Sequence, residues 1–291
     1  MLWGGVWIAF FSAELSRAAV PDTQPAALLQ AQYASLGERL HHNPFRRALD
    51  LDSSEASNDL KGDVYALVNY PFATVNAALN SPEHWCDVLI LPINTKYCHA
   101  TTNEGNTVMM VRIGKKTSQP VEDAYPIEFH YHLVAATPKY LEIQLSAEEG
   151  PLGTRNYLIL LQAVPVEHGR TFLHLTYSYA YGLAGRLAMQ TYLATIGSDK
   201  VGFTPTGRQT HGQPDYIGGM RGLMERNAMR YYLAIGAYLG ALSALPATQL
   251  QKRLQSWFTS TEQYPRQLHE IDRAAYIDMK RSEYLRQQTS R

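Results

Sequence analysis

The sequence has no surplus of either charge: 26 Lys and Arg residues balance 26 Asp and Glu residues, so the net charge is zero. A protein whose main partner is nucleic acid usually carries a basic surplus, and nucleic-acid binding is therefore not expected. Charged residues are also few, at 18% against 45% hydrophobic residues. A chain of 291 residues with this balance can bury a sizeable core, which excludes an intrinsically disordered protein.

Long hydrophobic runs are also lacking. The apolar run at the start covers residues 1–11, whereas a membrane-spanning helix needs about 20. Small and polar residues follow up to residue 19, and this pattern predicts a signal peptide over residues 1–19 and a periplasmic or secreted protein. Because no Lys or Arg precedes the run, the alternative is a buried N-terminal segment of a cytoplasmic protein.

Cysteine is scarce, and its two occurrences, Cys86 and Cys98, are twelve residues apart. In an exported chain this pair favours a disulfide bond, which would stabilise the fold by about 2 to 4 kcal/mol. The alternative is two buried thiols, as in many cytosolic proteins. Neither cysteine belongs to a CxxC pair, which argues against a zinc site.

Catalytic signatures are missing as well. No GxSxG, HExxH, Walker or dinucleotide-binding sequence occurs, so neither a catalytic residue nor a cofactor is predicted. The one metal-like pattern is Glu128, His130 and His132, which alternation places on one face of a strand. Their neighbours at residues 127, 129, 131 and 133 form an apolar face. We therefore expect the three polar side chains to be solvated on the outer face, and no metal is predicted.

Tyrosine, by contrast, is abundant, with 19 residues against 8 Phe and 4 Trp. Tyrosines suit half-buried strand positions and the walls of amphipathic cavities. Residues 64–70 have the composition of a strand, and residues 72–85 have helical spacing. Short turns then separate six further segments of strand composition, which predicts an antiparallel meander: residues 97–102, 107–114, 127–135, 140–147, 157–164 and 171–181.

Helical periodicity returns after the meander. It covers residues 183–196 and, beyond a polar Gly-rich loop, residues 216–245, a long helix that Pro246 is expected to stop. The chain is thus expected to consist of four parts: the signal peptide (1–19), an N-terminal helical extension and acidic linker (20–60), a main domain (61–245) and a C-terminal helical extension (246–291).

This order of elements is similar to the START and polyketide-cyclase (SRPBCC, Bet v 1-like) helix-grip superfamily. The segments that carry the resemblance are Gly-Asp-Val-Tyr-Ala-Leu-Val-Asn-Tyr-Pro-Phe at 62–72, Asn-Ser-Pro-Glu-His-Trp at 80–85 and Tyr-Ile-Gly-Gly-Met-Arg-Gly-Leu-Met at 216–224. The resemblance covers residues 61–245 and implies an α+β fold, in which a curved antiparallel seven-stranded sheet wraps around a long C-terminal helix. The segment 183–215 and the residues after 245 depart from the pattern.

The resemblance also implies an apolar cavity between sheet and helix that carries a hydrophobic small molecule or lipid, with a transient membrane contact as a further partner. Five glycines of the long helix are expected to leave space for the ligand, and residues 183–214 to act as a gate. The candidate ligand-binding side chains come from the strands and the helix: Arg112, Phe129, Tyr131, Tyr177, Tyr179, Met220, Met224 and Tyr231.

Three alternatives stay open at this point. The helix glycines and the tyrosines of residues 171–181 also fit ordinary packing of helix on sheet with no ligand. A polyketide cyclase or aromatase-like enzyme would use the same pocket residues for chemistry. An interaction module would use the extra helices to bind a partner protein.

Overall fold

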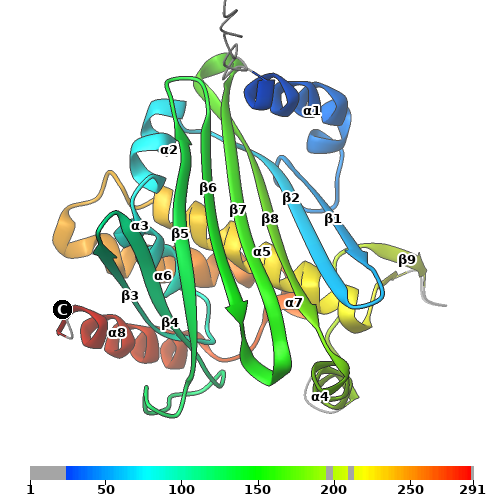
Figure 1. The fold of residues 1–291 in the computed structure, drawn as a ribbon. Helices are drawn as coiled ribbons and strands as arrows, with labels where there is room; N and C mark the ends of the chain where they lie inside the picture. The colour runs from blue at the N-terminus through cyan, green and yellow to red at the C-terminus, as the bar shows by residue number, and fades with distance from the viewer. Residues whose placement is uncertain (1–23, 195–198, 209–212, 290–291) are drawn as a thin grey trace, which may run out of the picture.

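An eight-stranded antiparallel sheet runs through the computed structural model, which describes residues 24–194, 199–208 and 213–289 (Figure 1). The strand order is β1-β2-β8-β7-β6-β5-β4-β3, so β3 to β8 form a meander that returns to β2. The strands are β1 (Leu49–Glu55), β2 (Asp59–Val68), β3 (Thr95–Asn103), β4 (Asn106–Ile113), β5 (Tyr125–Ala136), β6 (Leu141–Glu149), β7 (Thr154–Val166) and β8 (Arg170–Tyr181).

Helices cover the inner face of this sheet and close its ends (Figure 1). A 3-10 turn, η1 (Pro151–Gly153), precedes β7, and a separate two-stranded sheet pairs β9 (Pro205–Arg208) with β10 (Pro214–Tyr216). The helices are α1 (Gln24–His41), α2 (Phe72–Leu79), α3 (Pro82–Leu89), α4 (Leu183–Ala194), α5 (Gly219–Leu239), α6 (Pro246–Thr261), α7 (Pro265–Leu268) and α8 (Arg273–Thr289).

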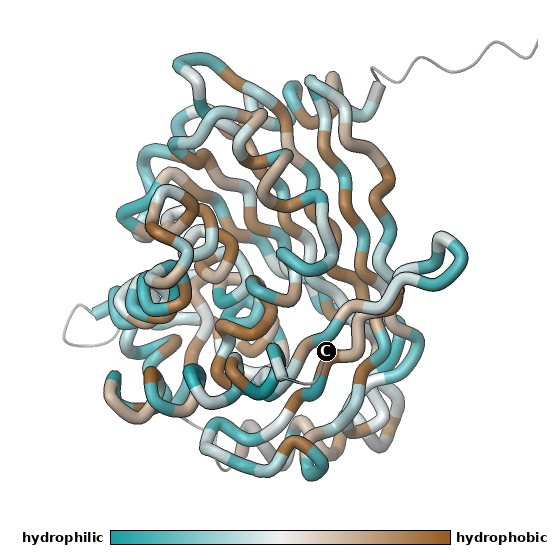
Figure 2. The backbone as a smooth tube through the Cα atoms, turned by 90° about the vertical axis from the view of Figure 1, so that its left-hand side faces the viewer, coloured by the Kyte–Doolittle hydropathy of each residue, from teal (hydrophilic) through white to brown (hydrophobic). Residues whose placement is uncertain are grey.

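The two faces of the sheet differ because successive side chains of a strand point in opposite directions. In β8, Leu173, Leu175 and Tyr177 enter the main core, whereas His174 lies on the outer face (Figure 2 shows the alternation of hydropathy along the strands). The outer face is covered at one end by α1, which packs a smaller apolar cluster against Phe172 and its neighbours.

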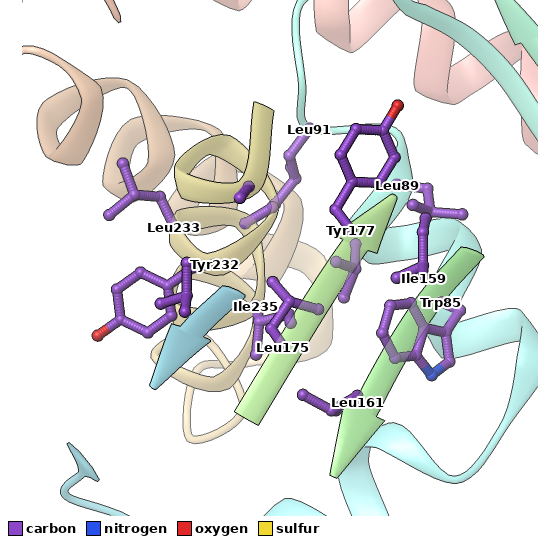
Figure 3. Close-up of a cluster of buried hydrophobic side chains, with 14 of the residues drawn as sticks. Trp85, Leu89, Leu91, Ile159, Leu161, Leu175, Tyr177, Tyr232, Leu233 and Ile235 are labelled. Atoms are coloured by element: carbon purple, nitrogen blue, oxygen red, sulfur yellow. The ribbon is translucent and has the colours of Figure 1, made fainter. Parts of the chain in front are cut away.

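The main core lies between the inner face and helices α2, α3 and α5 (Figure 3). Leu161 of β7 and Leu175 of β8 face Trp85 of α3 and Ile235 of α5. The indole nitrogen of Trp85 donates a hydrogen bond to the carbonyl of Leu79 at 2.8 Å, so this fully buried ring leaves no polar atom unpaired.

Helix α5 packs against β1, β2 and β8, while α3 lies between α5 and the strands β3 and β4. Gly62 of β2 makes the close packing possible. A Cβ atom added there would lie 3.1 Å from the Cβ of Ala228 and 3.1 Å from the Cγ of Met224. The helix α5 therefore touches the sheet at β1, β2 and β8, whereas α3 separates it from β3 and β4.

The expected α+β helix-grip class is confirmed by this topology, with two corrections. The sheet has eight strands instead of seven, because residues 49–55, expected in an acidic linker, form the edge strand β1. Its Leu49 and Leu51 point inward while Asp50 and Asp52 point outward, an alternation that the acidic composition obscured.

The long helix is also shorter than expected. Helix α5 begins at Gly219, where a positive φ of 60° turns the chain, and ends at Leu239. Tyr216 belongs to β10, and Pro246 is the first residue of α6 rather than only a stop. The predicted signal peptide, residues 1–19, lies outside the described residues. Within the described residues, no helix is long and apolar enough to cross a membrane.

Candidate functional site

A small cavity lies where sheet and helix are held apart. Its volume is about 160 Å³, and its walls come from α3, β3 to β5, η1, β7, β8, α4 and α5. The lining residues are mostly apolar or aromatic: Leu89, Asn94, Thr95, Val111, Ile113, Ile127, Phe129, Pro151, Leu152, Thr154, Tyr157, Tyr177, Tyr179, Met189, Asn227 and Tyr231.

Four tyrosines form the centre of the cavity wall. Tyr157 of β7 stacks on Tyr179 of β8 with ring centroids 5.1 Å apart, and Tyr177 of β8 lies 5.1 Å from Tyr231 of α5. Cross-strand neighbours bring the first three rings together, since Ile159 of β7 pairs with Tyr177 in the ladder. The tyrosine cluster thus joins two central strands to the helix across the core.

Each hydroxyl of the tyrosine cluster stays protonated at neutral pH. Burial raises the pKa of Tyr157 to about 12, because a phenolate is poorly solvated there. Burial raises the pKa values of Tyr177, Tyr179 and Tyr231 further, and for Tyr177 the neighbouring tyrosine Tyr231 adds to the effect. A protonated phenol donates one hydrogen bond and also accepts, so the cavity offers neutral polar groups to a ligand.

Existing contacts already hold part of this polar lining. The Tyr157 hydroxyl lies 2.7 Å from Oγ1 of Thr154, and the Tyr179 hydroxyl donates to the sulfur of Met189 at 3.6 Å. Nη1 of Arg230 donates to Oδ1 of Asn227 at 3.2 Å, which orients that amide. The cavity therefore combines apolar walls with a few fixed polar groups, the usual composition of a small-molecule site.

Four of the eight residues predicted to bind ligand line the cavity: Phe129, Tyr177, Tyr179 and Tyr231. Tyr131 is buried on the same face of β5 but is not part of the wall, and its hydroxyl oxygen is buried without a hydrogen-bond partner. The remaining three do not line it either.

Arg112 points away from the cavity, because its neighbours Val111 and Ile113 in β4 take the inward positions. Its guanidinium donates to the carbonyl of Ala124 at 3.3 Å. Met224 is fully buried against Gly62 of β2, in the closely packed half of the interface. Met220 packs, half-buried, against the core outside the cavity wall. These three side chains therefore contact other parts of the fold and lie outside the wall of this cavity.

The helix glycines do not create the cavity, in contrast to the sequence-based expectation. Gly218 and Gly240 cap the two ends of α5, and Gly219 begins it. A Cβ on Gly222 would lie 2.7 Å from the carbonyl oxygen of Ile217, and Gly236 lines a different pocket. The cavity wall contains none of these glycines and is formed largely by aromatic and aliphatic side chains.

The expected gate, residues 183–214, is described only in part, since residues 195–198 and 209–212 lie outside the described residues. Helix α4 contributes Met189 to the cavity wall, and Gly185 of α4 packs against the carbonyl oxygen of Leu152 in η1. Leu152 lines the cavity while being 64% exposed, so it marks where the cavity meets solvent.

The metal-like pattern takes the position expected for it. Glu128, His130 and His132 are exposed on the outer face of β5, while Ile127, Phe129 and Tyr131 are buried. Leu133 departs from the alternation, since it is 44% exposed next to a bulge in the β5–β6 pairing. Among the described residues, no three His, Cys, Asp or Glu side chains are grouped as metal ligands.

Cys86 and Cys98 form a disulfide bond, with Cα atoms 5.2 Å apart. The bond ties α3 to β3, beside the cavity residues Leu89 and Thr95. It closes a short loop, so it restricts the unfolded chain and stabilises this corner by about 2 to 4 kcal/mol.

Sequence reasoning missed several wall residues. Tyr157 shares the inward face of β7 with Ile159 and Leu161, so strand alternation alone could have identified it. Met189 and Asn227 carry no such signal, because their positions depend on how α4 and α5 dock on the sheet.

No family model matches the sequence, and no curated protein does. Among solved structures, TTHA0849 from Thermus thermophilus is 12% identical, with a TM-score of 0.41 over 63% of this chain and 99% of that one.

Two enzymes are also among the similar structures. The Zhui aromatase/cyclase from Streptomyces sp. R1128 is 13% identical, with a TM-score of 0.36 over 69% of this chain and 94% of that one. Norcoclaurine synthase from Thalictrum flavum is 12% identical, with a TM-score of 0.33 over 52% of this chain and 81% of that one. Similarity at this level does not transfer an activity.

The chain itself thus defines the class of protein. Its antiparallel meander returning to β2, with α5 across the inner face, is a helix-grip fold. This is the fold that the resemblance to the START and polyketide-cyclase superfamily implied.

Proposed function

We propose that this protein binds a small, largely apolar molecule, about the size of one aromatic ring with a polar substituent, in the tyrosine-lined cavity. The observation that carries the proposal is a cavity of about 160 Å³ whose wall combines Phe129 with the four rings of the tyrosine cluster. A dry apolar cavity of about 150 Å³ in another protein binds benzene, so the space suffices for such a ligand.

The polar substituent would be recognised by neutral groups. Tyr177 and Tyr231 supply hydroxyls that burial keeps protonated, and Asn227 supplies an amide. A phenol, alcohol or carbonyl group can exchange hydrogen bonds with them, whereas an ionised group would lose hydration without gaining a counter-charge from the wall. This favours an uncharged ligand.

Carriage of a whole lipid would need the same cavity to accept a much larger ligand. Small-molecule pockets usually have volumes of about 300 to 1,000 Å³, so a lipid would fit only if a wall moved. Helix α4 is the candidate wall, because Met189 contacts Tyr179 while Leu183 and Leu187 of the same helix are exposed. A ligand series of increasing chain length would measure how far the cavity opens.

The test uses p-cresol as the ring-sized ligand and calorimetry of the full chain. Ile127→Phe fills the cavity from β5, and Leu133→Phe adds the same group to an exposed position of that strand. We expect Ile127→Phe to weaken binding by at least about tenfold while Leu133→Phe binds like the wild type. Equal binding by the two folded variants, or no binding by the wild-type protein, would contradict the proposal.

A cyclase or aromatase-like enzyme is the alternative, and the protonated hydroxyls of Tyr177 and Tyr231 are the observation that favours it. Such hydroxyls could donate to a substrate carbonyl. Turnover of a supplied polyketide that Tyr177→Phe abolishes without loss of binding would support catalysis. Recovery of the unchanged ligand would support binding alone.

A further inference from the structure

A second pocket lies on another side of α5, with a volume of about 370 Å³. It shares no lining residue with the tyrosine-lined cavity. Tyr231 faces the first cavity and Tyr232 the second, as expected for adjacent residues of a helix with 3.6 residues per turn. The lining residues come from the segment before β1, the end of β2, the start of β8, α5 and α6: Arg47, Ala48, Leu67, Val68, Asn69, Tyr70, Arg170, Tyr232, Leu233, Gly236, Ser256 and Ser260. We call this the arginine pocket.

Two guanidinium groups give the arginine pocket its charge. Arg47 donates from Nη2 to Oγ of Ser260 at 3.0 Å and to Oε1 of Gln263 at 3.1 Å, and it also interacts with the hydroxyl of Tyr232. These partners are neutral. Among the described residues, no hydrogen bond or ion pair joins Arg47 to a carboxylate.

Arg170 is the second cation of the pocket. It pairs with Glu167 at 3.2 Å, and the side chain of Glu167 is 50% exposed and is not part of the wall. The described lining residues include no Asp or Glu. The arginine pocket is therefore a positively charged recess whose Arg47 is positioned by neutral hydrogen bonds, an arrangement that can accept an oxyanion.

Gly236 keeps the arginine pocket open. Glycine inside a helix costs roughly 1 kcal/mol relative to alanine. Gly236 lies three residues before the end of α5, and a Cβ added there would meet no atom within 4 Å. Close packing therefore does not require the glycine. A larger side chain at this position would occupy the pocket instead.

We propose that the arginine pocket binds a small organic oxyanion, a phosphate monoester or a carboxylate. Arg47 and Arg170 pair with the acid group, and the hydroxyls of Ser256 and Ser260 supply further hydrogen bonds. The organic part lies against the apolar wall formed by Leu67, Val68 and Leu233. The volume of the arginine pocket, about 370 Å³, is within the usual range of small-molecule sites. The proposal does not depend on what the tyrosine-lined cavity binds.

The test measures binding of phenyl phosphate, benzoate and inorganic phosphate to the full chain by calorimetry at low salt. We expect the wild-type protein to bind at least one of the two organic anions more tightly than inorganic phosphate. The comparison between phenyl phosphate and benzoate identifies the preferred acid group.

Three variants and a matched control locate the site. Arg47→Gln and Arg170→Gln each remove a charge, and Gly236→Leu fills the space. Arg46→Gln removes the same charge from a neighbouring exposed residue outside the arginine pocket. We expect the first three to weaken binding of the organic anion by about tenfold or more and the control to change it little.

Thermal unfolding shows which variants are folded. Arg170→Gln leaves the contacts of Arg47 with α6 intact, so the site remains testable if Arg47→Gln fails to fold. The proposal is overturned if the wild-type protein binds neither organic anion. It is also overturned if folded Arg170→Gln and Gly236→Leu bind as tightly as the wild type, or if the Arg46→Gln control loses as much affinity as they do.

Discussion

The two halves of the sheet–helix interface are built in opposite ways. On the β1–β2 side, Gly62 has no side chain, and Met224 and Ala228 of α5 lie directly against the strand. Beyond β2, Tyr177 of the neighbouring strand β8 and Tyr157 of β7 lie near Tyr231 of α5, and a cavity of about 160 Å³ extends from these rings towards β4 and β5. Small residues let strand and helix approach closely in the first region, whereas aromatic rings line the space that remains in the second.

This difference shows which part of the fold is available for function. The closed half fixes where α5 lies, so the hollow half need not contribute that contact. The hollow half is held at its rim instead, where the disulfide joins α3 to β3 and where α8 docks on β3. The residues around the cavity can thus differ without changing the contacts that position α5 on the sheet.

The largest expected effect concerns the buried ion pairs that attach α8 to β3, next to the cavity. Glu283 of α8 pairs with the ammonium groups of Lys96 at 3.0 Å and Lys280 at 2.7 Å, and all three side chains are at least 98% buried. Glu283→Gln leaves two buried cations without a counter-charge, so we expect it to lower the free energy of unfolding by about 3 to 5 kcal/mol at pH 6. Urea unfolding measures the loss.

The loss from Glu283→Gln should be smaller at pH 9. Burial lowers the pKa of Lys280 to about 8, and removal of the neighbouring carboxylate lowers this pKa further, so the lysine is neutral at pH 9. Glu262→Gln is the control, because Glu262 forms a partly exposed pair with His269. This variant should lose less than about 1 kcal/mol of the free energy of unfolding. Similar small losses for both variants would show that α8 does not hold the rim.

The next prediction compares the loss of stability caused by added side-chain volume in the closely packed region and at the cavity. Gly62→Val inserts carbon atoms where the helix is in contact, and we expect a loss of about 2 kcal/mol because strand and helix must separate. Ile127→Phe adds volume where space exists, and we expect a loss below about 1 kcal/mol. Chemical denaturation of the two variants is the measurement. Equal losses would mean that the halves are packed alike.

The smallest effect concerns alkaline pH. The pKa of Tyr157 is about 12 in the folded protein because of burial, against 10.0 for an exposed tyrosine. Between these values the folded state binds more protons than the unfolded state, so stability is present below pH 10 and falls as pH rises. We expect about 1.4 kcal/mol to be lost by pH 11 through this residue.

Tyr157→Phe tests this expectation, because the variant lacks the titrating group. Its free energy of unfolding should fall less steeply between pH 9 and 11 than that of the wild type. Tyr125→Phe is the control, since Tyr125 is 41% exposed. Parallel pH profiles of the Tyr157→Phe variant and the wild type would contradict the burial of this hydroxyl.

Much of the fold followed from local patterns. Strand composition and the intervening turns located β3 to β8 to within a few residues, and alternation placed Phe129 on the apolar face of its strand. The same rule left Glu128 and the two histidines of β5 on the outer face. Local patterns succeeded here because each of these strands has one face in the core.

Other parts needed the tertiary structure. The strand β1 was read as a linker because an edge strand exposes its polar face, and Arg39 of α1 pairs with Asp50 there at 2.6 Å. The roles of the glycines were also misjudged, since sequence shows where a side chain is missing but not what lies opposite. Gly62 closes one interface, and Gly236 lines a pocket that no pattern had indicated.

The sequence by itself indicated the order of strands and helices, from which the resemblance implied the class of fold, and it left one possible partner for each cysteine, because these depend on local spacing or on a single available pair. Only the tertiary structure decided which inward residues surround a cavity, how large it is and that Arg47 and Arg170 line the same pocket. Those properties depend on how α4, α5 and α6 dock on the sheet, and docking is set by contacts between residues far apart in the chain.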